Sequence, residues 1–147
     1  MFFGLNEFAV RLSAAVFGVI GIFFMMLAAR AAHGRTTALV LGCLLAICPW
    51  QIQMSRYGAE YVYWLGTFPI GFYLLLKSRE NPAWLPVTAA AFVLSLYTYY
   101  PSLFITPLFL LGIGVGLWRS GYLQKYRKQV LLSAAIFLIM CSPLYQG

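Results

Sequence analysis

Residues 12–29 read LSAAVFGVIGIFFMMLAA, a stretch of 18 residues without a charged side chain. Four further stretches also lack charge: residues 36–55, 61–76, 81–118 and 129–147. Because a helix rises about 1.5 Å per residue, about 20 apolar residues cross a hydrocarbon core about 30 Å thick. Residues 81–118 are long enough for two crossings, with a hairpin expected at 97–102, YTYYPS. The pattern predicts an all-α, polytopic membrane helical bundle of about six transmembrane segments.

The composition also indicates a membrane protein. The chain of 147 residues is 63% hydrophobic and only 9% charged, whereas soluble domains carry about 25% charged residues, and this excludes a soluble fold. At this length we expect a single transmembrane domain over residues 1–147. The net charge of +7 does not indicate a nucleic-acid-binding protein, because the Lys and Arg residues fall at the ends of the apolar stretches.

Positive charge is concentrated in three of the gaps between apolar stretches. Residues 30–35, 77–80 and 119–128 hold eight of the ten Lys and Arg residues. By the positive-inside rule we expect all three gaps to face the cytoplasm. The N-terminal segment, the connection around residues 56–60 and the uncharged 97–102 hairpin are then expected on the outer side of the membrane.

Two pairs of opposite charges lie near the predicted outer boundary, Glu7 with Arg11 and Arg56 with Glu60. Ionisable groups near a membrane core are unfavourable, and they therefore mark candidate functional sites. Residues 51–60 are polar, aromatic and interrupted by glycine, and such a segment can line a wet cavity in which an arginine binds a phosphate or carboxylate. The alternative is that both pairs are interfacial anchors that neutralise one another.

No metal-binding or catalytic motif stands out in the sequence. Cys43, Cys48 and Cys141 fall inside the apolar stretches, where we expect them to pack as small apolar residues, and we expect neither a metal nor a cofactor. Gly112 and Gly116 have the small-xxx-small spacing that lets two membrane helices approach closely. We therefore expect a helix–helix partner at these two glycines.

Three segments carry a further pattern, in this order: NEFAVRLSAAVFG at 6–18, CPWQIQMSRYGAE at 48–60 and LSLYTYYP at 94–101. They resemble N-E-x-x-x-R-L-P-S-A-x-x-G, S-P-W-H-I-x-x-S-R-x-G-x-E and L-x-L-Y-T-Y-x-x of the polyprenyl-phosphate-dependent glycosyltransferases of the C-type superfamily. The similar branch contains protein O-mannosyltransferases and aminoarabinose transferases. The sequence departs from these signatures at Ser13, where the family usually has Pro, and at Gln51, where His is common.

The resemblance implies an integral protein of the bacterial inner membrane that transfers a sugar from a polyprenyl-phosphate donor to an acceptor on the outer face. In such an inverting transfer a carboxylate activates the acceptor, and positive groups stabilise the departing lipid phosphate. By resemblance, Arg11 and Arg56 have this electrostatic role, and Tyr57 and Glu60 line the cavity. The family's essential acidic residue lies in the first outer loop, before the segment at 6–18. We therefore expect no catalytic residue in this chain and no activity from it alone.

Two other interpretations remain open. One is a small oligomeric membrane transporter subunit or scaffold, although no acidic residue lies in the middle of an apolar stretch, where transporters usually carry a charge. The other is a noncatalytic partner that binds polyprenyl phosphate. Because the predicted orientation puts Met1 on the outer face, we also hypothesise that an N-terminal crossing precedes it in a longer protein.

Overall fold

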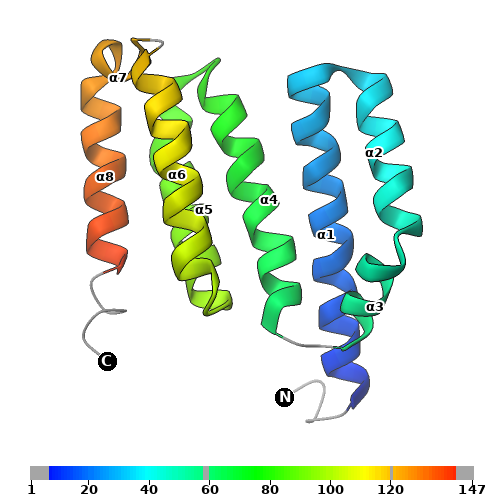
Figure 1. Cartoon of the computed structure of the whole chain (residues 1–147). Coiled ribbons are helices and arrows are strands. Elements are labelled where there is room, and N and C mark those ends of the chain that lie inside the picture. The colour runs from blue at the N-terminus through cyan, green and yellow to red at the C-terminus, as the bar shows by residue number, and fades with distance from the viewer. Residues whose placement is uncertain (1–6, 58–59, 120, 142–147) are drawn as a thin grey trace.

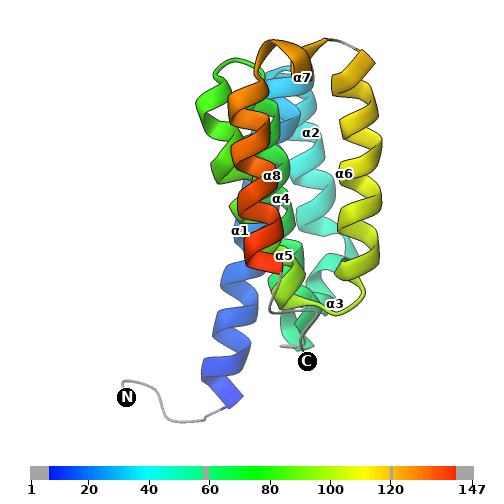
Figure 2. The same ribbon diagram turned by 90° about the vertical axis from the view of Figure 1, so that its left-hand side faces the viewer.

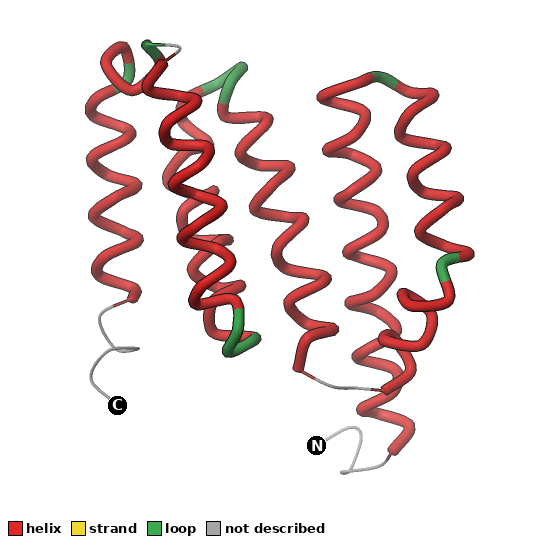
Figure 3. The backbone as a smooth tube through the Cα atoms, in the orientation of Figure 1, coloured by secondary structure: helices red, strands yellow, loops and turns green. Residues whose placement is uncertain are grey.

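The computed structural model describes residues 7–57, 60–119 and 121–141. All regular structure in these ranges is helical, as the tube in Figure 3 shows. The elements in chain order are α1 (Glu7–His33), α2 (Arg35–Ile47), α3 (Pro49–Tyr57), α4 (Glu60–Ser78), the 3₁₀ turn η1 (Pro82–Trp84), α5 (Leu85–Thr98), α6 (Ser102–Arg119), α7 (Tyr122–Lys125) and α8 (Arg127–Cys141). The prediction of an all-α membrane protein is confirmed.

By length and composition, two or three of the helical segments in the described residues can cross a membrane. Two helical stretches, Phe8–His33 and Ser102–Arg119, are each long and apolar enough to cross a membrane. The bent pair α2–α3 makes a third if it counts as one span. Within the described residues, α4, α5 and α8 do not combine the same length and apolarity. The prediction of about six transmembrane segments therefore stays a prediction.

The helices stand side by side, and α1, α2, α4, α5, α6 and α8 alternate in direction along the chain, so that the packed neighbours α1 and α4 run in the same direction, as do α5 and α8. In Figures 1 and 2, α2, α1, α4, α5 and α8 follow one another, and α6 lies against α5. The α1–α2, α4–η1 and α6–α8 connections, which carry most of the Lys and Arg residues, lie at the same end of the bundle, and we call this the basic end. The opposite end holds the start of α1, the helix α3, the start of α4 and the α5–α6 hairpin, and we call it the α3 end. That the basic end faces the cytoplasm stays a prediction.

A bend of 58° separates α2 from α3. Proline has no backbone N–H, and the residue before a proline is disfavoured in the helical conformation. Cys48 accordingly adopts an extended conformation with ψ of 117°, directly before Pro49. The break in the helix falls at Pro49, and residues 51–57 of the polar segment 51–60 belong to the second helix, α3. After the bend α3 packs against α1, with Gln51 and Ser55 next to Gly18 of α1.

The predicted hairpin at 97–102 is present between the end of α5 and the start of α6. The hydroxyl of Ser102, which is fully buried, closes this hairpin. It lies 3.0 Å from the carbonyl oxygen of Ser95 and 2.5 Å from that of Tyr99. The last carbonyl groups of a helix have no partner within the helix, and Ser102 therefore supplies a donor that the end of α5 needs.

Glycines let α1 and α4 pack closely. An ideal Cβ placed on Gly21 would lie 2.4 Å from the carbonyl oxygen of Leu65, and one on Gly66 would lie 2.9 Å from the carbonyl oxygen of Phe17. Close approach of two backbones at small residues is how membrane helices gain packing contacts where lipid and protein are equally apolar. The α1–α4 pair therefore forms the closely packed centre of the bundle.

Helix α6 has its glycines in open space. In the described part of the chain, no atom lies within 4 Å of an ideal Cβ on Gly112, Gly114 or Gly116. The helix–helix partner predicted at Gly112 and Gly116 is thus not a helix among the described residues. A partner outside this chain stays a prediction.

Large apolar side chains cover the outside of the bundle. Examples from three helices are Val19 and Phe23 on α1, Leu44 on α2, and Leu138 and Ile139 on α8. Contact between such an apolar surface and water is unfavourable, whereas contact between this surface and lipid chains is not. The exposed surface therefore agrees with an integral membrane protein.

Candidate functional site

Arg56 lines a groove at the α3 end of the bundle. The groove has a volume of about 420 Å³ and follows the α2–α3 bend, with Ile47, Pro49, Ile52 and Gln53 as its other walls. Arg56 occupies the last turn of α3, and its side chain is exposed. A guanidinium group can bind a phosphate through two parallel hydrogen bonds, and the apolar walls suit a hydrocarbon chain. The groove thus combines the two surfaces that a phosphorylated lipid requires.

Two contacts hold α3 against α1. An ideal Cβ on Gly18 would lie 2.9 Å from the Cβ of Ser55, and a larger residue at this position would therefore push α3 away. The side-chain amide of Gln51 donates to the carbonyl oxygen of Gly18 at 3.5 Å. Gln51 therefore lies in the contact that positions α3, the helix that carries Arg56. The family signature commonly has His at this position.

Ser13, the other position that departs from the signature, joins α1 to α4. Its hydroxyl lies 2.9 Å from the hydroxyl of Tyr63 and 2.8 Å from the carbonyl oxygen of Val10. The ring of Tyr63 also packs edge-on against Phe17, with 5.0 Å between the ring centroids. A proline at position 13 has no hydroxyl and would lose this link. Both departures therefore fall where α1 contacts a neighbouring helix near the α3 end.

The sequence-predicted site residues come from three helices that meet at this end. Arg11 lies on α1 with an exposed side chain, and Glu60 is exposed in the first turn of α4. Arg56 is carried by α3, as described above. The side chains of Tyr57 and Glu7 lie outside the described residues. The fold thus brings Arg11, Arg56 and Glu60 to one end of the bundle, as predicted from the charge pattern.

An aromatic cluster that sequence reasoning did not single out lies between α4 and the α5–α6 hairpin. The Trp64 ring lies 5.1 Å from Phe68 and 6.1 Å from Tyr99, and Tyr61 lies 6.4 Å from Tyr99, measured between centroids. Within the described ranges, the buried indole N–H of Trp64 has no hydrogen-bond partner. Buried donors are nearly always paired, so this group is a candidate contact for a ligand. The sequence could not predict this candidate contact, because a single Trp in an apolar stretch does not show whether its indole N–H is buried or paired.

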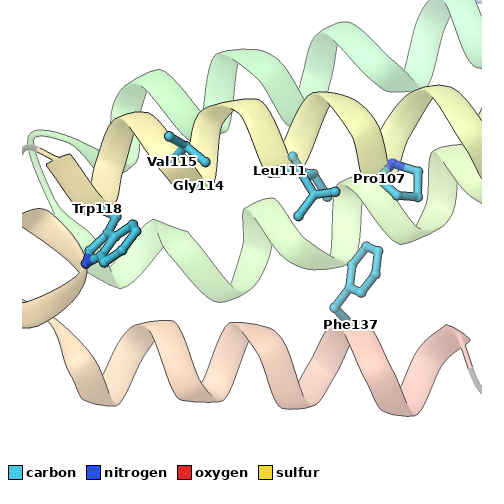
Figure 4. A pocket seen from close by; sticks show the side chains of 7 residues that line it. Pro107, Leu111, Gly114, Val115, Trp118 and Phe137 are labelled. Carbon is cyan, nitrogen blue, oxygen red and sulfur yellow. The ribbon is translucent and has the colours of Figure 1, made fainter.

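A second hollow, between α6 and α8, has no comparable chemistry. It measures about 550 Å³, and Figure 4 shows its lining residues, which are Pro107, Leu110, Leu111, Gly114, Val115, Trp118 and Phe137. None of these described lining residues is charged. The hollow can hold an apolar chain, but it offers no cation to a phosphate.

The His, Cys, Asp and Glu side chains, which could bind a metal ion, do not cluster in the described part of the chain. There, no group of three His, Cys, Asp or Glu side chains is placed to hold a metal ion. Cys43 and Cys48 are both free thiols, the first exposed on the outside of the bundle and the second half-buried at the α2–α3 bend. The side chain of Cys141 lies outside the described residues.

Comparison with known protein families gives a match. The family model for dolichyl-phosphate-mannose-protein mannosyltransferases matches residues 1–145, which include all three segments with the recognisable signatures. Neither curated proteins nor solved structures give a match to the chain. The family match confirms the predicted resemblance to membrane glycosyltransferases of the protein O-mannosyltransferase branch. This chain therefore belongs to the dolichyl-phosphate-mannose-protein mannosyltransferase family.

Proposed function

We propose that this chain forms part of an integral-membrane glycosyltransferase that transfers a sugar from a polyprenyl-phosphate donor to an acceptor on the outer face of the membrane. Membership of the mannosyltransferase family supports the class of reaction. The observation that carries the proposal for this chain is the groove in which Arg56 lies beside apolar walls at the α3 end. The donor has an anionic phosphate attached to an apolar chain, and it therefore matches both parts of that groove.

Arg56 binds the phosphate of the donor in this proposal. Its guanidinium carries several N–H donors in a fixed plane, so it can hold two phosphate oxygens at once. Gln53 adds a neutral amide beside it, and Ile47 and Ile52 contact the first part of the isoprenoid chain. The Gly18–Ser55 contact fixes α3 on α1 and so limits the movement of the arginine.

Charge develops on the phosphate during transfer. The acceptor oxygen forms a bond to the anomeric carbon, the bond from that carbon to the phosphate oxygen breaks, and its electron pair remains on the phosphate. The acceptor proton passes to a carboxylate, and we assign no catalytic residue of this kind to the chain. Arg11 and Arg56 stabilise the more negative phosphate that leaves, because nearby cations favour the state with more negative charge. By resemblance to the family signatures, we also assign Tyr57 and Glu60 to the binding of the donor.

The alternative function is that of a small oligomeric transporter subunit or scaffold. One observation favours it: the open glycine face of α6, where nothing in the described chain lies within 4 Å of an ideal Cβ on Gly112 or Gly116. A second membrane helix can approach such a face closely. This function requires no affinity for a lipid phosphate, and the two proposals therefore differ in a measurable property.

Donor binding by the purified chain in lipid nanodiscs tests the proposal, with a short-chain polyprenyl phosphate as the probe. We expect Arg56→Gln to weaken binding by about tenfold or more, because a hydrogen bond to a charged group contributes about 1.5–3 kcal/mol. Arg56→Lys should bind the donor more tightly than Arg56→Gln but less tightly than the wild type, because an ammonium lacks the planar pair of donors. Arg35→Gln removes the same charge at the basic end and serves as the control. Equal binding by Arg56→Gln and the wild type would mean that Arg56 is an interfacial anchor and does not bind the phosphate. If the wild type itself does not bind the probe, the result favours the transporter subunit or scaffold.

A further inference from the structure

The basic end holds a hollow that the proposed transfer does not use. It measures about 400 Å³ and is lined by Arg79, Leu117, Gly121, Tyr122, Lys125 and Tyr126. Arg79 follows the end of α4, and Lys125 ends α7, so two cations from separate connections share one concave space. Among the residues that the structure describes, none of those lining this hollow is acidic.

Specific contacts fix α7 on the end of α4. The hydroxyl of Tyr122 donates to the carbonyl oxygen of Ser78 at 2.5 Å. The rings of Tyr122 and Tyr126 lie 4.8 Å apart between centroids, and the Nζ of Lys125 lies 5.4 Å from the centroid of the Tyr126 ring. Gly121 adopts a φ of 72°, a left-handed conformation that glycine enters without strain, and so lets α7 begin here. The hollow is therefore built by packed residues and hydrogen bonds.

An apolar groove between α4 and α6 adjoins this hollow. It measures about 200 Å³ and is lined by Phe72, Leu75, Leu76, Arg79, Ile113, Gly116 and Leu117. Arg79 and Leu117 line both spaces, so the two spaces are adjacent. Gly116 keeps the groove open, since an ideal Cβ there meets no described atom within 4 Å.

We propose that these two adjoining hollows bind one anionic membrane phospholipid, with its phosphate between Arg79 and Lys125 and part of one acyl chain along the α4–α6 groove. Two cations and a tyrosine-lined wall suit a phosphate headgroup, and the apolar groove that continues from them suits the chain attached to it. Basic pockets between membrane helices bind anionic headgroups in this way. The proposal is independent of the donor groove, which lies at the opposite end of the bundle.

Native mass spectrometry of the whole chain in detergent tests this site, with phosphatidylglycerol and phosphatidylcholine of equal chain length as the probes. We expect one phosphatidylglycerol to be retained in preference to phosphatidylcholine. The double variant Arg79→Gln/Lys125→Gln should weaken retention of phosphatidylglycerol at least about tenfold, because each basic group near a membrane surface contributes about 1 kcal/mol. The matched control is Arg30→Gln/Arg35→Gln, which removes the same charge from the α1–α2 connection and should retain the lipid as the wild type does.

Gly116→Leu separates a lipid from a free phosphate. The Cβ added at position 116 meets no described atom within 4 Å, so the helix should form as before, and the rest of the leucine side chain occupies the groove. We expect it to weaken retention of phosphatidylglycerol severalfold, and we expect millimolar inorganic phosphate not to displace the lipid. Displacement by phosphate together with full retention by Gly116→Leu would show a free-phosphate site and contradict the lipid proposal. Wild-type retention by the Arg79/Lys125 variant, or an equal loss in the control, would contradict it as well.

Discussion

Gly21 of α1 lies so close to Leu65 of α4 that an ideal Cβ on the glycine would sit 2.4 Å from the carbonyl oxygen of Leu65. Real Cβ atoms essentially never approach another atom this closely, so the packing of α1 against α4 depends on glycine at this position. Helix α3, which carries Arg56, packs on the same α1. The close α1–α4 contact therefore supports the geometry of the proposed donor groove as well as the stability of the fold.

Gly21→Ala should destabilise the protein. The added methyl group meets the backbone of α4, which cannot move aside as a flexible side chain would, and overpacking of this kind costs about 1–3 kcal/mol. Gly112→Ala is the matched control, because an ideal Cβ at Gly112 meets no described atom within 4 Å. Thermal unfolding in detergent, followed by circular dichroism, measures the difference. Equal melting temperatures for the two variants would show that α1 and α4 do not pack as described.

The Ser13–Tyr63 hydrogen bond should appear as a coupling energy in a double-mutant cycle. Ser13→Ala and Tyr63→Phe each remove one partner of the 2.9 Å contact, and we expect each to lower the free energy of unfolding by about 0.5–1.5 kcal/mol. Because both changes break the same bond, the double variant should lose less than the sum of the two. Chemical denaturation in detergent gives the three values. Strict additivity would mean that the two hydroxyls do not interact.

Pro49→Ala should relax the bend between α2 and α3. An alanine has the N–H that proline lacks, and it frees the preceding residue to adopt the helical conformation, so the two helices can approach a continuous one. We expect the distance between spin labels at Val40 and Gln53 to lengthen, and polyprenyl phosphate to bind more weakly because α3 is displaced. Pro107→Ala, inside α6, is the control and should change neither measurement. An unchanged label distance would show that the bend does not depend on Pro49.

Tyr122 gives the protein a pH-dependent contact outside the proposed spans. Burial raises the pKa of its phenol most, the side chain of Ser78 lowers the pKa by less, and the neighbouring Tyr126 raises it again. The folded state therefore holds the phenol proton more tightly than the unfolded state does. The resulting stability is fully present below the unfolded pKa of about 10 and is lost as the pH rises through the folded pKa.

Tyr122→Phe should therefore be less stable than the wild type at neutral pH, by about 0.5–1.5 kcal/mol for the lost bond to Ser78. The difference should shrink as the pH rises above about 10, because the wild type then loses the proton that it donates. Melting temperatures of both proteins between about pH 8 and pH 11 test this. Tyr100→Phe, at an exposed tyrosine, is the control. A wild-type advantage that grows with pH would contradict the assignment.

The ends of the helices could be predicted from the sequence because local residues determine them. Pro49 breaks the second apolar stretch, and the 97–102 hairpin lies where Pro101 falls in the fourth. The three basic connections lie at one end of the bundle, as their alternation along the chain predicted. Proline geometry and charge placement act within a few residues, so they can be recognised before the fold is known.

The faces of the helices could not be predicted in the same way. Helix α1 is apolar nearly all round, so hydrophobic periodicity does not indicate which side packs inward. The spacing of Gly112 and Gly116 predicted a close helix–helix contact on α6, whereas Gly21 and Gly66 make the close contact between α1 and α4. The indole N–H of Trp64, which has no hydrogen-bond partner among the described residues, likewise depends on neighbours such as Tyr99 of the α5–α6 hairpin, which only the folded chain brings near.

The central claim is that the α3 end faces the outside of the cell and binds a lipid phosphate at Arg56. Sided labelling of Gln53→Cys, in a variant that lacks the three native cysteines, tests this most directly, because Gln53 lines the same groove. Arg35→Cys, at the basic end, is the control that should react only from the cytosolic side. We predict that a membrane-impermeant maleimide labels Gln53→Cys from outside intact cells, and that added polyprenyl phosphate slows the reaction. Labelling of Gln53→Cys from the cytosolic side alone, with no protection by polyprenyl phosphate, would contradict the claim.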